Sequence, residues 1–186
     1  MTRCSIAIKR ERKVTLYRRK LPHLEKPGAT YFVTFKTRNG FMLPDKAKSL
    51  VLGHCLYENG KSYTLHCAIV MRTHVHLLFT PQPNVRLAAI MNGMKGASSH
   101  SVNKLLHRKG SLWLDESFDH MIRSDGEFDD KVLYIQMNAM ETGVSHPELY
   151  PWYWREPAQA GAPVLQRTKR AKDPWLSPSS APRTQP

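Results

Sequence analysis

The sequence predicts an α+β protein built on an antiparallel sheet, and three observations lead to this prediction. Segments rich in β-branched and aromatic residues alternate with segments of helical periodicity. Two strand-like segments, residues 63–70 and 73–80, follow one another so closely that they should form an antiparallel hairpin. Hydrophobic residues make up 41% of the 186 residues, which is enough for a packed core.

The first half of the core should hold three strands and a helix. Residues 29–37 are β-branched and aromatic and lie between turn-forming pairs, so they predict the first strand. From Asp45 onward, apolar residues recur at helical spacing until Asn59-Gly60, which predicts a helix. The two strands of the hairpin complete this half.

The second half should hold a long helix, a short strand or loop, and a last helix. Asn84 is expected to cap the long helix over residues 85–106. Residues 113–122 suggest a short strand or loop, and the last helix, over residues 128–141, should stop at Gly143. The order β-α-β-β-α-(β)-α is that of a ferredoxin-like antiparallel sheet with helices on one face.

The charge of the chain points to a polyanionic partner. Its 28 Lys and Arg residues against 15 Asp and Glu give a net charge of +13, which favours nucleic acid first and an acidic membrane surface second. The excess lies in a basic N-terminal arm, residues 1–26, and in a Pro-rich basic tail, residues 155–186, that we expect to be disordered. Residues 27–154 are nearly balanced and form the predicted globular domain.

Several basic side chains are candidates for contacts with a phosphate backbone, whose strength would depend on salt. The charges of the arm have a second explanation, which is that the arm is solvated and only aids solubility. The end of the long helix and the residue after the short strand offer further cations. The candidates are Arg10, Arg12, Lys13, Arg18, Arg19, Lys20, Lys104, Arg108 and Arg123.

The sequence also limits where the protein should be found. No window approaches the roughly 18 consecutive apolar residues of a membrane span, and the N-terminus lacks the apolar run of a secretory signal. Three cysteines without a CxxC pair argue against a disulfide framework. We therefore expect a protein of the reducing cytoplasm.

His74-Val75-His76 lies inside an apolar strand and is the sharpest motif. Side chains alternate across a strand, so both imidazoles project from one face, about 7 Å apart at the backbone. At that separation they can converge on one divalent cation. Two polar residues on a solvent-facing side of a strand would show the same pattern.

Tyr134 and Asn138 form a second pattern on the last helix. Residues four apart share a helix face, so the Asn138 amide oxygen could complete a two-imidazole, one-oxygen metal site with Tyr134 as a nucleophile beside it. The alternative is a half-buried Tyr and an Asn that begins the C-terminal cap. The two patterns together favour a catalytic metal site more strongly than either pattern does alone.

With its surroundings, this pair of patterns resembles the IS200-like single-tyrosine (HUH) transposases. Residues 71–79 are similar to the histidine strand of that family, and residues 134–144 are similar to its tyrosine helix. The REP-associated tyrosine transposases, the branch associated with repetitive extragenic palindromes, are most similar. They share further blocks, and the resemblance covers roughly residues 22–154. These blocks are residues 31–35, Trp113, 118–123 and 150–152.

The resemblance implies an enzyme that cleaves and rejoins single-stranded or hairpin DNA. It implies a 5′-phosphotyrosine on Tyr134, with Mg²⁺ or Mn²⁺ between His74, His76 and Asn138. Imidazole and carbonyl ligands do not exclude Zn²⁺. The protein would be a bacterial, nucleoid-associated transposase, cytoplasmic, with no membrane partner. It would be a monomer or a homodimer acting on palindromic repeats.

Two alternatives to catalysis remain at this level. Arg72-Thr73, Ala139 and Thr142 depart from the usual residues of the family, so a catalytically silent, domesticated DNA-binding protein of the same fold is one alternative. An RNA-binding module is the other, but the sequence lacks its aromatic strand motifs. Near the end of the domain, residues 152–154 offer base-stacking surfaces, although we favour an aromatic plug packed on the sheet.

Overall fold

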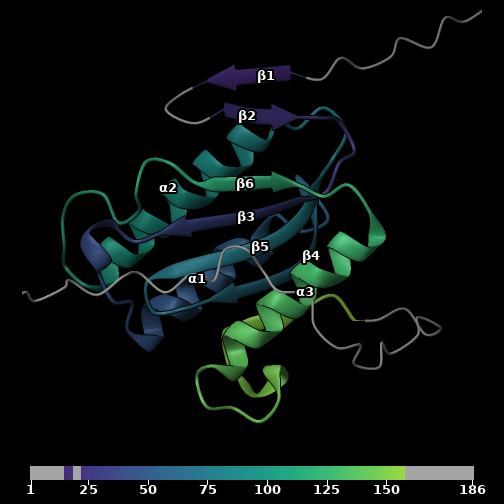
Figure 1. Ribbon diagram of the computed structural model, residues 1–186. Coiled ribbons are helices and arrows are strands. Elements are labelled where there is room, and N and C mark those ends of the chain that lie inside the picture. The colour runs from purple at the N-terminus through teal and green to yellow at the C-terminus, as the bar shows by residue number, and fades with distance from the viewer. Residues whose placement is uncertain (1–14, 19–21, 158–186) are drawn as a thin grey trace, which may run out of the picture. The chain divides into compact units, whose positions relative to one another are not determined.

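A five-stranded antiparallel sheet with the strand order β6-β3-β5-β4-β7 organises the protein (Figure 1). The computed structural model describes residues 15–18 and 22–157. A separate two-stranded sheet, not predicted from the sequence, pairs β1 with β2. The elements are β1 (Thr15–Arg18), β2 (Pro22–Glu25), β3 (Tyr31–Lys36), α1 (Asp45–Tyr57), β4 (Tyr63–Val70), β5 (His74–Pro81), α2 (Leu87–Leu105), β6 (Phe118–Met121), α3 (Asp125–Met140) and β7 (Tyr153–Arg155), with short 3-10 helices at Arg38–Gly40 and Pro147–Leu149.

The structure confirms the α+β class and the order of the elements. β4 and β5 form the expected antiparallel hairpin, and the short strand between the last two helices exists as β6. The cap of the long helix was predicted wrongly. Asn84 has a positive φ of 71° in the turn before the helix, and the N-cap is Arg86, without a side-chain hydrogen bond.

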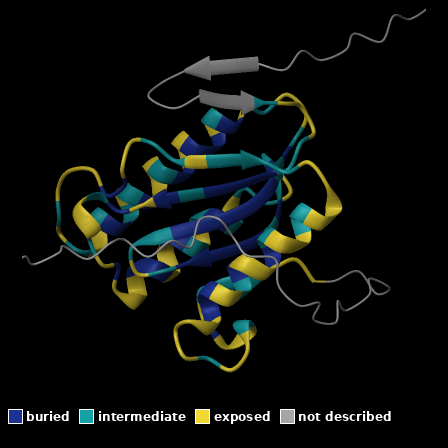
Figure 2. Ribbon diagram, viewed as in Figure 1, coloured by how far each residue is buried: buried dark blue, intermediate teal, exposed yellow. Residues whose placement is uncertain are grey.

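The three helices divide between the two faces of the sheet, with α1 and α2 behind it and α3 in front of it in Figure 1. The prediction that the helices share one face therefore holds for α1 and α2 but was wrong for α3. The reason lies in the central strands, which are buried on both sides, so their sequence does not show that a helix covers the second face. Figure 2 shows these strands as the buried centre of the domain.

Alternation along the strands separates two apolar clusters. Val33, Phe35 and Leu77 point toward α1 and α2. Phe32 and Leu78 point the other way and pack with α3. His76 directly precedes Leu77 in β5, so its side chain points to the opposite face, which is the α3 face. The paired histidines are therefore on the side of the sheet that carries the tyrosine helix.

Helix α3 is fixed at both of its ends and along its buried side. Its N-cap, Ser124, accepts a hydrogen bond from the backbone N–H of Glu127 at 3.2 Å. Gly143 follows the helix at a φ of 93°, which favours glycine and ends the helix where the sequence predicts. Ile135 and Ala139 are fully buried against the sheet.

The end of the domain packs on the sheet as the plug interpretation predicts. β7 adds to the edge of β4, and Trp154 packs against the core shared with α1 and α2. The Trp152 indole donates to the Ser49 hydroxyl at 3.0 Å and lies under the Lys48 ammonium, 3.4 Å from the ring centre. These aromatic residues therefore serve packing.

We predict that α3 docks chiefly through Ile135. Ile135→Ala should lower the free energy of unfolding by about 2–5 kcal/mol, because it removes buried apolar atoms and leaves a cavity. Leu133→Ala, on the exposed side of the same helix, should change it by no more than about 0.5 kcal/mol. Urea unfolding measures both values, and equal losses for the two variants would contradict the packing described.

Candidate active site

The imidazoles of His74 and His76 lie side by side on β5, with their ring centres 4.7 Å apart. The alternation of a strand gives both the same face, as predicted. His76 is buried and His74 is partly buried. The pair therefore lies at the bottom of the contact between the sheet and α3 and not on an open strand.

Tyr134 lies directly against His76. The two ring centres are 5.2 Å apart and the rings meet edge to face, and Phe32 contacts both rings. The side chain of Tyr134 is 37% exposed. The phenol thus has one side packed on the imidazole and the other open to solvent.

Asn138 is buried one turn further along α3. Its amide nitrogen donates to the backbone carbonyl of Tyr134 at 2.9 Å. With the nitrogen engaged in this way, the amide oxygen is the side-chain atom of Asn138 that can bind a metal ion. Asn138 also lies close enough to both imidazoles to oppose the lowering of their pKa values.

Burial favours the neutral form of both histidines. Desolvation lowers the pKa of His76 to about 3, and neighbouring His74 and Lys36 act in the same direction. Desolvation also lowers the pKa of His74. Neutral imidazoles hold the free lone pair that a metal ion needs.

One nitrogen of His76 has no partner among the described residues. Nδ1 is 2.7 Å from the Thr34 hydroxyl, whereas Nε2 is buried without a hydrogen bond. A buried polar atom without a partner is costly unless something outside the protein chain satisfies it. Thr34 was not among the predicted site residues, although the register that places it opposite His76 joins two predicted strands.

No group of three His, Cys, Asp or Glu side chains able to hold a metal occurs in the part of the chain that the structure describes. A metal ion at this site would therefore need the Asn138 oxygen beside the two imidazoles. The structure brings His74, His76 and Asn138, the three predicted ligands, together in one place.

The candidate phosphate contacts are spread over the molecule. Arg123 lies just before Ser124, the N-cap of α3, and its backbone N–H donates to the Glu127 carboxylate at 2.7 Å. Lys104 and Arg108 lie at the end of α2, on the face away from the histidines, and the Arg108 guanidinium stacks on Phe41 at 4.3 Å. Arg18 is in β1. The remaining candidates, Arg10, Arg12, Lys13, Arg19 and Lys20, lie outside the described residues.

Two cations that were not among the predicted contacts lie nearer to the site. Lys36 is opposite His74 across the strands and lowers the pKa of both histidines. The Lys131 ammonium lies 5.3 Å from the centre of the Phe32 ring. The register between β3 and β5 places Lys36 near the site, and the docking of α3 places Lys131 there. The sequence alone shows neither.

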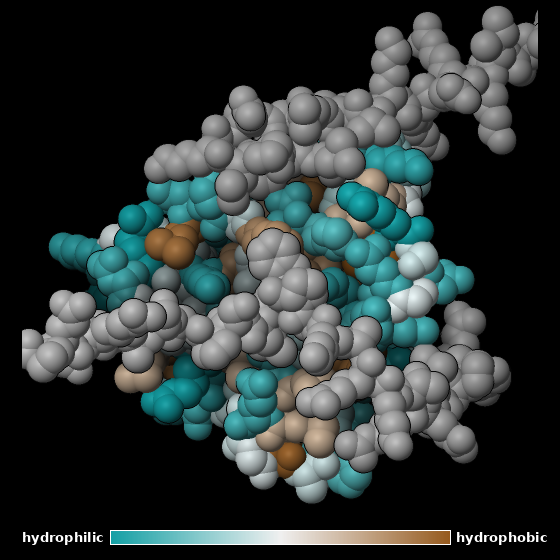
Figure 3. All heavy atoms as spheres, in the orientation of Figure 1, coloured by the Kyte–Doolittle hydropathy of each residue, from teal (hydrophilic) through white to brown (hydrophobic). Residues whose placement is uncertain are grey.

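The visible part of the α3 side of the domain is mixed in character. Figure 3 shows hydrophilic side chains there around smaller hydrophobic patches. Helix α3 has exposed apolar side chains, among them Leu133, Met137 and Met140. No described helix is long and apolar enough to cross a membrane.

Comparisons with known proteins identify the family of the chain and a structure of similar fold. Residues 34–137 match the family model described as "Transposase IS200 like". A solved structure of a REP-associated tyrosine transposase bound to a REP hairpin is 18% identical and covers 81% of this chain and 98% of that one, with a TM-score of 0.59. A candidate transposase from Deinococcus radiodurans R1 is 23% identical, covers 60% of this chain and 91% of that one, and has a TM-score of 0.43. No curated protein matches the sequence.

We predict that His76 makes the stability of the protein depend on pH. The folded imidazole stays neutral down to about pH 3, whereas the unfolded one takes up a proton near pH 6.5. Within this window the unfolded state binds more protons, so the free energy of unfolding should fall as the pH falls, by up to about 1.4 kcal/mol per pH unit. Urea unfolding between pH 6.5 and 5 measures the slope. His76→Gln should flatten it, and an unchanged slope in that variant would contradict the assignment.

Proposed function

The chain belongs to the IS200-like transposase family, and from this membership we propose that it cleaves and rejoins single-stranded or hairpin DNA. The nucleophile is Tyr134. The ligands of a divalent cation, Mg²⁺ or Mn²⁺, are His74, His76 and Asn138. The observation that carries the proposal is the unpartnered, buried Nε2 of His76, which lies in the same contact as the Tyr134 phenol and the Asn138 side chain.

The surroundings of the three ligands suit a metal ion. Donation of the Nδ1 proton of His76 to the Thr34 hydroxyl leaves the lone pair on Nε2. The bond from the Asn138 nitrogen to the helix backbone fixes the orientation of the amide, whose oxygen is the proposed ligand. Two nitrogens and one oxygen leave coordination positions for phosphate oxygens and water.

The chemical step is a displacement at phosphorus. The Tyr134 oxygen attacks the scissile phosphate, the bond from phosphorus to the 3′-oxygen breaks, and that oxygen leaves with a proton as a free hydroxyl. The product is a 5′-phosphotyrosine. Attack by a 3′-hydroxyl on this bond reverses the step, so rejoining needs no nucleotide cofactor.

The protein contributes position and charge to this step. Contact with His76 and Phe32 holds the ring of Tyr134 at one side, while its exposed side admits the DNA. When bound, the cation supplies positive charge that withdraws negative charge from the non-bridging phosphate oxygens and favours an ionised phenol. Burial of His76 keeps water from competing for its lone pair.

A hairpin is the proposed form of the substrate. The REP-associated transposase with the same fold is bound to a REP hairpin, and the net charge of +13 fits a polyanion. Lys36 and Lys131 are near the proposed metal ligands. The basic arm is the proposed contact with the paired stem.

We predict a covalent protein–DNA adduct that depends on Tyr134. The full chain, incubated with Mn²⁺ and a labelled hairpin that carries single-stranded tails, should give a band that resists denaturation. Tyr134→Phe lacks the attacking oxygen and should abolish it. Tyr57→Phe is the matched control, since that phenol is exposed on α1, and it should keep the adduct.

Removal of the metal or of one ligand should act on the same adduct. EDTA should abolish it, and His76→Ala and Asn138→Ala should reduce it at least about a hundredfold, because each variant lacks a ligand close to the phosphate. Binding of Mn²⁺ to the protein without DNA, followed by calorimetry, should weaken in both variants. If the parent binds the hairpin but forms no adduct with any divalent cation, the non-catalytic DNA-binding alternative holds instead.

We also predict a salt-dependent contribution of the arm to hairpin binding. Replacing Arg18, Arg19 and Lys20 together by Ala should weaken binding and make the slope of log K against log salt less negative, by about 0.9 for each phosphate that the arm no longer neutralises. Lys61→Ala, with its ammonium over the Tyr57 ring on α1, is the control. Filter binding at several salt concentrations measures the slopes. An unchanged slope in the triple variant would show that the arm is only solvated and does not contact the DNA.

A further inference from the structure

Phe118 is an exposed aromatic residue on the same face of the sheet as the proposed active site. It begins the edge strand β6 and is 56% exposed. The direction of its side chain follows from its neighbours. Asp119 lines the same hollow as Val33 and Met91 of α2, and His120 hydrogen bonds to Glu127 of α3. By alternation, Phe118 points to the α3 side with His120.

A single cross-strand row joins Phe118 to the paired histidines. Phe118 is the partner of Thr34 on β3, and Thr34 is the partner of His76 on β5. The Thr34 hydroxyl also bonds to His76. Neighbouring strands are about 4.8 Å apart, so the backbone of Phe118 lies about 10 Å from that of His76. A nucleotide next to a phosphate at the site would reach this ring.

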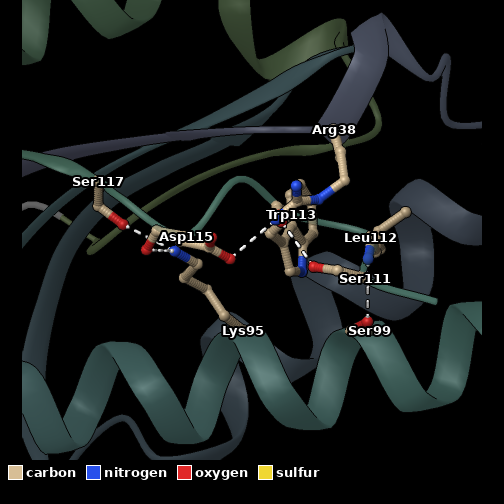
Figure 4. Close-up of polar contacts among 8 residues, drawn as sticks. All are labelled: Arg38, Lys95, Ser99, Ser111, Leu112, Trp113, Asp115 and Ser117. Carbon is tan, nitrogen blue, oxygen red and sulfur yellow. Dashed lines mark hydrogen bonds and ion pairs between the residues drawn. The ribbon is translucent and has the colours of Figure 1, made fainter.

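The segment before Phe118 is held by a dense polar network (Figure 4). The Lys95 ammonium of α2 bonds to the Asp115 carbonyl at 2.8 Å and to the Ser117 hydroxyl at 3.2 Å. Arg38 forms an ion pair with the Asp115 carboxylate at 2.8 Å. The backbone that presents Phe118 is therefore anchored from two other elements.

The start of this segment is also anchored. The Trp113 indole donates to Ser98 at 3.0 Å and the Leu112 N–H donates to Ser99 at 3.3 Å, both on α2. An aromatic ring on a fixed backbone loses little conformational freedom when it binds a partner. Exposure on a loose loop would not have this advantage.

Positive charge flanks the face between Phe118 and the site. Lys36 is exposed two residues after Thr34 and so projects from the same side of β3. Lys131 lies over Phe32, the neighbour of His120 across β3 and β6. An aromatic ring between cations is the arrangement that binds single-stranded nucleic acid, in which bases stack and phosphates pair with the charges.

We propose that Phe118 is a stacking platform for an unpaired base of the DNA strand whose phosphate occupies the active site. This inference rests on the proposed function and names a contact of that same site. A phenyl ring has no hydrogen-bonding group, so it holds any base by its flat face and does not read the sequence. Phe118 therefore contributes affinity and position of the strand, and the chemical step stays with Tyr134.

The test measures binding of single-stranded oligonucleotides in which the fluorescent base 2-aminopurine replaces one base at a time. Every protein tested is the full chain with Tyr134→Phe, which prevents cleavage. Phe118→Ala should weaken binding about tenfold, within the roughly five- to 150-fold range that stacking of one base supplies. At one position of the fluorescent base, quenching should disappear with the ring. Phe118→Trp should restore both, whereas Phe118→Leu keeps apolar area without a ring and should behave like Ala.

The second measurement is the rate of adduct formation as a function of DNA concentration, in proteins that keep Tyr134. Phe118→Ala should raise the DNA concentration for half-maximal rate about tenfold and leave the rate at saturation nearly unchanged. Tyr57→Ala removes a similarly exposed aromatic ring from α1 and should change neither quantity. Unchanged melting temperatures show that all variants fold.

Two outcomes overturn the platform. One is equal affinity of the parent and Phe118→Ala, and the other is full affinity of Phe118→Leu, which would show apolar contact without stacking. Failure of the proposed function gives a different pair of results. The parent then forms no adduct, while the quenching of 2-aminopurine fluorescence and its dependence on Phe118 persist.

Discussion

The packing of α3 on the second face of the sheet is the constraint on which the site depends. Ile135 and Ala139 bury their side chains against strands whose other face is already covered by α1 and α2. Once they are buried, the helical repeat leaves Tyr134 beside His76 and Asn138 beside both imidazoles. The geometry of the proposed chemistry is therefore set by apolar contacts of residues that take no part in it.

The same packing divides the α3 face into two parts. α3 contacts β4 and β5, while the row toward the β6 edge ends in an exposed ring at Phe118. Burial in the covered part lowers the pKa of His76, and the Nε2 of that side chain has no hydrogen bond among the described residues. The open part leaves the Phe118 ring exposed to solvent. A fully covered face would exclude the substrate, and a fully open one would hydrate the imidazoles and weaken their preference for the neutral form.

The sequence predicted the local structure of the core well because local signals are strong there. The segment 63–70 is a strand with the predicted limits, and Gly143 ends the last helix with a positive φ. The prediction at Asn84 failed because an Asn suits both an N-cap and a left-handed turn, and only the path of the chain chooses between them. The prediction that α3 shares a face with the other helices failed because strands buried on both sides do not show which face a helix covers.

By itself, the sequence determined the class of the fold, the shared face of His74 and His76 and the shared face of Tyr134 and Asn138, because the periods of a strand and a helix follow from backbone geometry alone. Tertiary structure decided that these two faces meet. It also placed Thr34, Lys36 and Phe118 around them, and it separated Lys104 and Arg108 from the site. Register and helix docking join residues that are far apart along the chain, so no local pattern records them.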